Sequence, residues 1–385
     1  MTEVRELASA EAVAACVREA RAARTPLRII GGGHWLDAGR PCLAAESLRL
    51  ASLRGITEYE PGDLTLTARA GTSLGEIADA TSRHEQWLTL DPFGSRDGTI
   101  GATIATGSAG SLASAFGTPR DHLLGCEIVT GVGDVVRAGG RVVKNVAGFD
   151  LARLMTGAWG TLGALTEVTV RLRAKPEVDR TLAIEMESSA DGPATRAWRW
   201  LRASPFTPLA AELCSANLAR MLGIADGDVL LVRLGGNARL VRSAQQAVAE
   251  LGDLQELDAD VWDRLRVAEP PSAAVVRLGT TPASVGALWS AASDAAQRAG
   301  GYAHATLERG IVRCVVPVTE SEEENGRLRG IVGELQSSGS RIVERLPASL
   351  WDGAPSVIAD RLSTGIRQAF DPDSLLNPGI LGATT

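Results

Sequence analysis

The chain has 385 residues, of which 45% are hydrophobic and 22% are charged, so it is long enough to form two globular domains. Its net charge of −7 comes without a dense block of lysine or arginine, which argues against nucleic acid or an anionic membrane as the main partner. No apolar run reaches the roughly 18 residues that a transmembrane helix needs. The acidic, amphipathic start of the chain is also unlike a signal peptide.

The cysteines and histidines predict no metal site. The five cysteines are scattered and form no Cys-x-x-Cys pair, which fits reduced thiols in the cytoplasm and neither an iron–sulfur nor a zinc site. The four histidines never fall at the i, i+4 spacing of a helical metal pair. We therefore expect no bound metal.

The first predicted elements are a helix over 9–23 and a strand over 27–30, which runs into Gly31-Gly32-Gly33-His34. Successive backbone N–H groups in such a glycine loop can converge on one anion, so the loop suits a pyrophosphate. It is not a Rossmann loop, because Leu36 stands where the third glycine of that motif is needed. The chain also has no GxxxxGK[ST] phosphate loop.

A strand is expected over 64–69, followed by a helix for which Thr72 is the predicted N-cap. The stretch from Gly98 to Leu172 is rich in glycine, serine and threonine, but the segments between the glycines are too apolar for a linker. It predicts a folded cradle whose N–H groups face an anionic ligand. A turn-rich β domain is the alternative. Within the stretch we expect a hairpin over 127–136, a helix over 145–155 and a strand over 165–172.

Pro176 marks the predicted domain boundary, because glycine clusters become rare after it. Strands and helices then alternate, which indicates an α+β domain with an antiparallel sheet covered by helices. The strands are expected at 181–186, 229–234, 274–278 and 312–318, and the helices at 192–203, 237–251, 283–298 and 320–337. The tail carries a predicted helix over 357–369 and ends in FDPDSLLNPGIL.

Several of these motifs resemble one known family. The strand leading to GGGH, then GTIGATIATG, GTPRDHLLG and a terminal DPDSLLNPG, resemble the FAD domain of the vanillyl-alcohol oxidase/PCMH flavoprotein superfamily. The string VVKNVAGFDLARLMTGAWGTLG is similar to the FAD-binding subunits of bacterial glycolate oxidases. The resemblance covers about 1–176 and 366–380, and matches the middle of the chain only loosely.

The resemblance implies an α+β fold with a two-subdomain PCMH-type FAD-binding domain over 1–176. An α+β cap domain with an antiparallel sheet would follow over 177–350, and the segment 351–385 would return to the FAD-binding domain. The expected cofactor is FAD. By the resemblance it is bound by Gly31, Gly32, Gly33, His34, Gly98, Thr99, Gly101, Gly107, Gly117, Arg120, Asp121, Asn145, Gly163, Leu165 and Asn377.

Three of these assignments have alternatives. Arg120 could instead form a surface ion pair with Asp121 or another acid. Lys144, which with Asn145 lies near the cofactor by the resemblance, could be an ordinary solvated lysine. A histidine at the place of His34 bonds covalently to the flavin in several relatives, whereas the glycolate oxidase subunits resembled here hold FAD non-covalently. We expect non-covalent FAD, with a covalent link through His34 as the alternative.

Catalytic residues are harder to predict. Oxidation of a 2-hydroxy acid needs a base for the hydroxyl proton and a cation for the carboxylate. The HxGDGN-like string of the catalytic relatives is absent from this sequence. His304, with Glu308, Arg309 and Arg313 nearby, and Arg277 are weak candidates in the cap, as is Lys144. The favoured explanation of His304 and its neighbours is an ordinary polar strand surface, and an arginine such as Arg277 is more often structural than catalytic.

The resemblance implies an FAD-dependent oxidoreductase that is the FAD-binding subunit of a glycolate oxidase-type complex. It would support oxidation of a small 2-hydroxy acid, glycolate to glyoxylate, beside a second flavin subunit and an iron–sulfur subunit. We expect it in the cytoplasm, or at the periphery of the inner membrane through these partners. One alternative is a stand-alone FAD-dependent 2-hydroxy-acid or alcohol oxidase. Another is a scaffold that has lost FAD.

Overall fold

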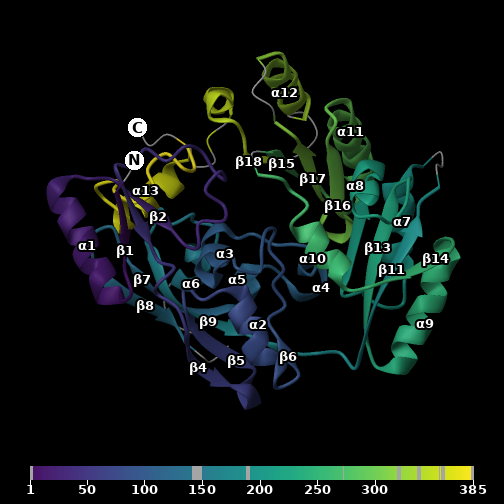
Figure 1. Cartoon of the computed structure of the whole chain (residues 1–385), viewed down its shortest axis with the longest axis horizontal. Coiled ribbons are helices and arrows are strands. Elements are labelled where there is room, and N and C mark those ends of the chain that lie inside the picture. Colours follow the sequence, from purple (N-terminus) through teal and green to yellow (C-terminus); the bar gives the residue numbers. More distant parts are fainter. Residues whose placement is uncertain are drawn as a thin grey trace. The chain divides into compact units, whose positions relative to one another are not determined.

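The computed structural model of the protein describes residues 3–140, 150–187, 191–271, 273–318, 322–335, 340–354, 356 and 360–382. The chain divides into two compact units, shown in Figure 1. The first unit contains Met1–Ala109, Gly117–Lys175 and Pro355–Thr385, and the second contains Gly110–Phe116 and Pro176–Ala354. The short segment Gly110–Phe116, which the sequence analysis includes in the first range, thus packs with the second unit.

The first unit begins with a parallel three-stranded sheet in the order β1-β3-β2, formed by Glu3–Glu6, Glu46–Arg49 and Leu27–Ile30. Helix α1 (Ala10–Ala23) starts after Ser9, whose hydroxyl accepts a hydrogen bond from the N–H of Ala12. The helix buries the apolar side predicted from its periodicity. The predicted strand before the glycine loop is confirmed as β2.

The second sheet of this unit is antiparallel in the order β4-β5-β9-β7-β8. Its strands are Ile56–Glu60, Thr65–Arg69, Ala164–Arg171, Leu123–Val129 and Val135–Gly139. The expected hairpin is the β7–β8 pair. The remaining elements are α2 (Leu74–Ser82), β6 (Gln86–Trp87), α3 (Ile100–Thr106), α5 (Pro119–His122), α6 (Leu151–Met155) and β10 (Arg173–Ala174).

The predicted cap of α2 is wrong by one residue. Ser73 is the N-cap, since its hydroxyl accepts the N–H of Glu76 at 3.1 Å while the Glu76 carboxylate accepts the N–H of Ser73 at 2.9 Å. The hydroxyl of Thr72 instead bonds the backbone of Gly55. Two possible capping residues stand side by side in the sequence. The spacing favours Ser73, because Glu76 stands three positions after it, whereas Gly75 stands three positions after Thr72.

The second unit is built on one eight-stranded antiparallel sheet in the order β14-β11-β13-β12-β16-β17-β15-β18. The prediction of an α+β fold with an antiparallel sheet in this part is confirmed. In sheet order the strands are Leu254–Leu257, Val178–Glu185, Val229–Gly236, Ala210–Cys214, Tyr302–Thr306, Ile311–Val316, Ala274–Gly279 and Ser340–Arg345. The helices are α4 (Ala113–Phe116), α7 (Pro193–Ala203), α8 (Ala216–Met221), α9 (Ala238–Val248), α10 (Asp260–Arg266), α11 (Val285–Arg298) and α12 (Glu322–Glu334).

The two faces of this sheet differ in chemistry. Side chains alternate along each strand, so residues such as Leu213, Ala303 and Cys314 enter the apolar core that α7, α9, α11 and α12 help to form. The opposite face carries polar side chains on the same strands, and several of them are buried. Figure 1 shows α11 and α12 beside β16, β17 and β15.

The C-terminal segment packs into the first unit. Helix α13 (Arg361–Phe370) is capped by Asp360, whose carboxylate accepts the N–H groups of Leu362 and Ser363. Beyond it, the N–H of Leu27 donates to the carbonyl of Leu375 at 2.8 Å, and Leu376 forms a parallel bridge with Leu27. The segment therefore lies along the free edge of β2.

Candidate cofactor-binding site

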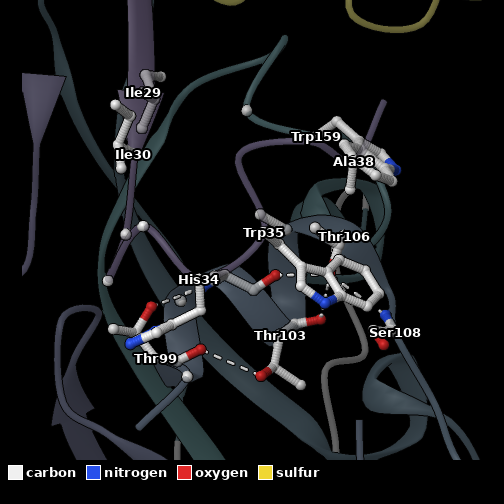
Figure 2. Close-up of a pocket in the computed structure, with 18 of the residues that line it drawn as sticks. Ile29, Ile30, His34, Trp35, Ala38, Thr99, Thr103, Thr106, Ser108 and Trp159 are labelled. Carbon is white, nitrogen blue, oxygen red and sulfur yellow. Dashed lines mark hydrogen bonds between the residues drawn. The ribbon is translucent and has the colours of Figure 1, made fainter. Parts of the chain in front are cut away.

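A pocket in the first unit lies where β2 ends in the glycine loop, as Figure 2 shows. Its other walls come from the loop before α3, from α3 itself, from the turn after α6 and from the C-terminal segment. The lining groups that the argument below uses are Arg28, Gly31, Gly32, Gly33, His34, Trp35, Phe93, Gly98, Thr99, Gly101, Thr103, Thr106, Ser108, Trp159, Gly163, Leu165 and Asn377. Each of them belongs to the first unit.

The glycine loop provides backbone donors. In the described part of the chain, no group accepts a hydrogen bond from the N–H of Gly31, Gly32, Gly33 or His34. Gly33 has φ of +87°, in the left-handed region that glycine adopts without strain. Four consecutive donors without acceptors beside a pocket fit an anionic group.

A residue with a side chain could not replace Gly31 or Gly32 without displacing a neighbour. A Cβ on Gly31 would lie 2.6 Å from Oγ1 of Thr99, and a Cβ on Gly32 would lie 2.8 Å from Nδ1 of His34. Figure 2 shows His34 and Thr99 together at this end of the pocket. The loop is thus packed closely against the start of α3.

Helix α3 is positioned by its cap and by one close approach. Thr99 is the N-cap, and its hydroxyl accepts the N–H of Ala102 at 3.3 Å. The N–H of Gly101 donates to the carbonyl of Ala70 at 2.9 Å, where a Cβ on Gly101 would lie only 2.6 Å from that of Ala70. This contact holds the first turn of α3 against the end of β5, and the side chains of Thr103 and Thr106 line the pocket from the helix.

The charge of the site also favours an anion. Arg28 lines the pocket, and no carboxylate is among the described lining residues. A second guanidinium lies close by, since Nη2 of Arg49 is 3.5 Å from the Cβ position of Gly33. Both cations would lower the free energy of a bound phosphate.

The rest of the pocket suits a large, flat and partly polar molecule. Trp35, Phe93 and Trp159 supply aromatic surface. The buried hydroxyl of Ser108 has no hydrogen-bond partner in the described structure, so it can bond a ligand. Donor loop, cations, aromatic walls and this hydroxyl together fit FAD, which combines a pyrophosphate with two ring systems.

Ten of the predicted cofactor residues line this one pocket: Gly31, Gly32, Gly33, His34, Gly98, Thr99, Gly101, Gly163, Leu165 and Asn377. Gly107 does not line it but ends α3, with φ of +66° and its N–H bonded to the carbonyls of Thr103 and Ile104. Lys144 and Asn145 lie outside the described residues, as does the first half of the helix predicted over 145–155. Asp150 caps the described half, α6.

The remaining predicted group, Gly117, Arg120 and Asp121, lies at the start of α5 and away from the pocket lining. The carboxylate of Asp121 accepts hydrogen bonds from the N–H and the hydroxyl of Thr118, at 2.8 and 2.9 Å. Arg120 is exposed, and no ion pair between its guanidinium and a described acid is present. This group shapes a local turn and helix start.

The two cap candidates for catalysis are already bound to acids of the second unit. Nδ1 of His304 lies 2.6 Å from Oε1 of Glu212, and His304 is 1% exposed. Arg277 forms an ion pair with Glu344 at 2.7 Å. Arg313, the neighbour of both on the sheet, pairs with Glu269 and Glu344. These contacts account for the polar groups without a substrate.

The aromatic side chains of the pocket and the two threonines of α3 that line it were not predicted from the sequence. Thr103 and Thr106 follow Thr99 at the spacing of one helical face, which would have indicated them if the segment had been interpreted as a helix. Trp35, Phe93 and Trp159 come from three separate loops and carry no shared signal. In the described residues, no group of three or more histidine, cysteine or acidic side chains could hold a metal ion.

Comparison with known proteins identifies the family. The protein-family model described as "FAD binding domain" matches residues 2–139 of the chain. The chain is 32% identical over 270 residues to the glycolate oxidase subunit GlcE of Escherichia coli K12, covering 70% of this chain and 71% of that protein. The chain belongs to the family of FAD-binding oxidoreductases with a PCMH-type domain. This FAD-dependent oxidoreductase is also 35% identical over 160 residues to glycolate oxidase subunit GlcD of Bacillus subtilis, over 41% of this chain and 34% of that one.

Solved structures confirm the fold of this FAD-dependent oxidoreductase. A crystal structure of p-cresol methylhydroxylase with bound substrate matches 99% of this chain and 88% of that one, with a TM-score of 0.74 and 17% identity. The match to the FAD binding domain and the identity to GlcE confirm the resemblance stated from the motifs, and with it FAD as the cofactor. Within the described chain, none of the helices combines the length and apolar character needed to cross a membrane.

Proposed function

We propose that this chain is the FAD-binding subunit of a glycolate oxidase-type complex. In such a complex it supports the oxidation of a small 2-hydroxy acid, glycolate to glyoxylate, beside a second flavin subunit and an iron–sulfur subunit. The observation that carries the proposal is the 32% identity to GlcE over 71% of that protein, combined with a pocket built for FAD. The first unit is then the FAD-binding domain and the second a cap, and any membrane association occurs through the partners.

The chain's own residues bind and orient the cofactor. The N–H groups of the glycine loop and the guanidinium of Arg28 hold the pyrophosphate, while Ser108, Thr103 and Thr106 bond polar edges of the flavin portion. FAD, when bound, supplies the acceptor for the two electrons that leave the substrate. The aromatic walls keep water away from the ring systems.

His304 and Arg277 are already bonded to acidic side chains, which supports an accessory subunit rather than a stand-alone oxidase. A catalytic base must be able to reach the proton of the substrate hydroxyl. His304 is 1% exposed and bonded to Glu212, and Arg277 is paired with Glu344. The second flavin subunit would therefore supply the base and the substrate cation.

Flavin binding tests the site. The purified chain should show a flavin absorption spectrum that persists when glycolate is added without oxygen, and that bleaches once the partner subunits are present. The variant Gly31→Ala, whose Cβ would push against Thr99, should weaken FAD binding by at least about tenfold, equivalent to about 1.4 kcal/mol. Gly62→Ala is the matched control, because a Cβ at Gly62 meets no atom within 4 Å.

Three outcomes would change the assignment. Equal FAD affinity for the two glycine variants would move the cofactor out of this pocket. Bleaching by glycolate alone would favour the stand-alone enzyme. Flavin that stays with the precipitated protein after denaturation would show a covalent link, for which His34 is the residue to replace. We propose non-covalent FAD, so the colour should remain in the supernatant.

A further inference from the structure

The turn after α6 contains a tryptophan in a backbone conformation that tryptophan rarely adopts. Trp159 has φ of +53°, and Gly157 and Gly160 in the same turn have φ of +78° and +70°. Glycine adopts such angles without strain, but a bulky residue in the left-handed region is an outlier that costs free energy. The turn thus has glycine at two of its three positive-φ positions and a strained tryptophan at the third.

A second residue with this unusual backbone conformation is bonded to the first. Among the described residues, six other than glycine have positive φ, and of these six Trp159 and Asn377 line the cofactor pocket. The carbonyl of Trp159 accepts a hydrogen bond from Nδ2 of Asn377 at 2.6 Å. Strained residues persist only where their surroundings hold them, and they cluster at ligand sites. The pair therefore points to a function in the pocket.

The backbone of Trp159 is held from two sides. Its N–H donates to the carbonyl of Ala105 in α3 at 2.8 Å. On the other side, Asn377 is itself fixed, because its N–H donates to the carbonyl of Leu27 at 2.8 Å and its Oδ1 accepts the N–H of Ile29 at 2.6 Å. Helix α3, strand β2 and the C-terminal segment all belong to the first unit, so the whole arrangement lies within one compact unit.

The indole of Trp159 is fixed as well. A Cβ on Gly39 would lie 3.0 Å from Cζ3 of Trp159 and 2.8 Å from Cγ1 of Ile380, so a side chain there would displace the ring or the isoleucine. Figure 2 shows Trp159 next to Ala38 and apart from His34. Trp159 is half-buried and lines the pocket, so part of its ring surface is open to a ligand.

We propose that Trp159 supplies an aromatic face for one of the two ring systems of FAD, and that Asn377 is the positioning residue that holds Trp159 in its strained conformation. The inference rests on the proposed role of this pocket as the FAD site. Asn377 fixes the carbonyl of Trp159 and so the direction in which the indole leaves the backbone. A wall that is ordered before FAD binds reduces the entropy lost on binding.

Replacing the tryptophan by glycine separates binding from stability. Trp159→Gly keeps the backbone hydrogen bonds and relieves the strain at φ of +53°, which offsets the packing that is lost with the indole. The thermal midpoint should therefore change little. The dissociation constant for FAD, measured by fluorescence titration of the FAD-free protein, should rise at least about tenfold. Trp159→Phe retains an aromatic ring and should recover most of the affinity.

Arg24→Gly is the matched control. Arg24 has the same φ of +53°, is exposed, and lies at the end of α1 outside the pocket lining. This variant should raise the thermal midpoint and leave the dissociation constant within about twofold of wild type. An unchanged dissociation constant in Trp159→Gly would overturn the inference, whatever happens to the midpoint.

A double-mutant cycle tests the positioning role of Asn377. Asn377→Ala removes the hydrogen bond to Trp159, so it should raise the dissociation constant at least about fivefold in the wild-type background but less than about twofold in Trp159→Gly. Asn377→Asp, which loses the same donor, takes its place if the alanine variant does not fold. Equal losses in the two backgrounds would show that Asn377 acts on FAD without Trp159 and would overturn its positioning role.

The outcomes also separate this inference from the proposed function. If Gly31→Ala weakens FAD binding and Trp159→Gly does not, the inference fails and the proposed function stands. A wild-type chain that binds no FAD would overturn both.

Discussion

The side-chain carbonyl of Asn377 accepts a hydrogen bond from the backbone N–H of Ile29 at 2.6 Å, although the two residues are 348 positions apart. The Nδ2 group of the same amide donates to the carbonyl of Trp159 at 2.6 Å. Asn377 is 3% exposed and has φ of +45°, a conformation that asparagine tolerates better than most residues. One side chain therefore connects β2, the turn after α6 and the C-terminal segment beside the pocket.

Replacing this amide by a carboxylate should keep the hydrogen bond that it accepts and remove the one that it donates. In Asn377→Asp one oxygen can still accept from Ile29, but the other faces the carbonyl oxygen of Trp159. We expect the free energy of unfolding to fall by about 1–3 kcal/mol, measured by urea denaturation. Asn237→Asp is the control, since Asn237 caps α9 through an oxygen that aspartate also provides. Equal stability of the two variants would contradict the prediction.

A buried histidine should make the first unit sensitive to acid. His122 is 3% exposed, with Nε2 2.6 Å from the hydroxyl of Thr89 and Nδ1 3.1 Å from the carbonyl of Thr118. Burial lowers the pKa of His122 below its ordinary value of 6.5 and outweighs the opposing hydrogen bond to Thr118. The folded state thus prefers the neutral ring, and its stability is present above that ordinary value and lost as the pH falls below it.

The pH dependence of unfolding checks this assignment. Between about pH 7.5 and about pH 5.5, His122→Gln should lose less stability than wild type, because a neutral amide does not titrate in this range. His84→Gln serves as the control, since His84 is exposed and packs edge-on against Tyr59. A profile for His122→Gln that parallels wild type would show that another group causes the acid sensitivity.

The buried ion pairs of the second unit should contribute more to the free energy of unfolding than its surface ion pairs. Arg313 is 4% exposed and bonds both Glu269 and Glu344, at 2.6 and 2.8 Å. Burial raises the pKa of the Glu344 carboxyl, but the guanidinium groups of Arg313 and Arg277 outweigh it, so this pKa lies below its ordinary value. Glu344 is thus charged, and both carboxylates pair with the single guanidinium of Arg313.

Removing the shared cation leaves two buried carboxylates. Arg313→Met should lower the free energy of unfolding by about 3–5 kcal/mol, as determined in guanidinium chloride. The control is Arg298→Met, which breaks an exposed pair with Glu334 and should cost less than about 1 kcal/mol. If both variants lost the same small amount, the network would contribute no more than a surface pair.

Local sequence patterns predicted those helices and strands in which apolar residues recur at a regular spacing. Helix α1, strand β2 and the β7–β8 hairpin follow from apolar spacing and turn glycines alone. Helix α3 does not, because its sequence IGATIAT is poor in helix-forming residues. It is stabilised by the Thr99 cap and by the contact of Gly101 with Ala70, which lies about 30 positions earlier.

From local patterns alone, without the family resemblance, only the backbone part of the candidate site was predictable. The glycine loop is contiguous in the sequence, and its donor role follows from glycine chemistry. The aromatic walls, the Asn377 bridge and the Glu212–His304 pair join residues far apart in the chain, and no local signal indicates such pairs. The same holds for Gly110–Phe116, whose sequence GSLASAF does not indicate which unit it joins.

The bridge between Leu27 and Leu376 can form only when synthesis of the chain is nearly finished. The edge of β2 is completed only when residues 375–377 have been made, after every residue that the second unit contains. On the ribosome the second unit can therefore close while the N-terminal strand still has an unpaired edge. An unpaired strand edge can pair with other chains, so the edge of β2 is open to wrong association until the C-terminal segment has been made.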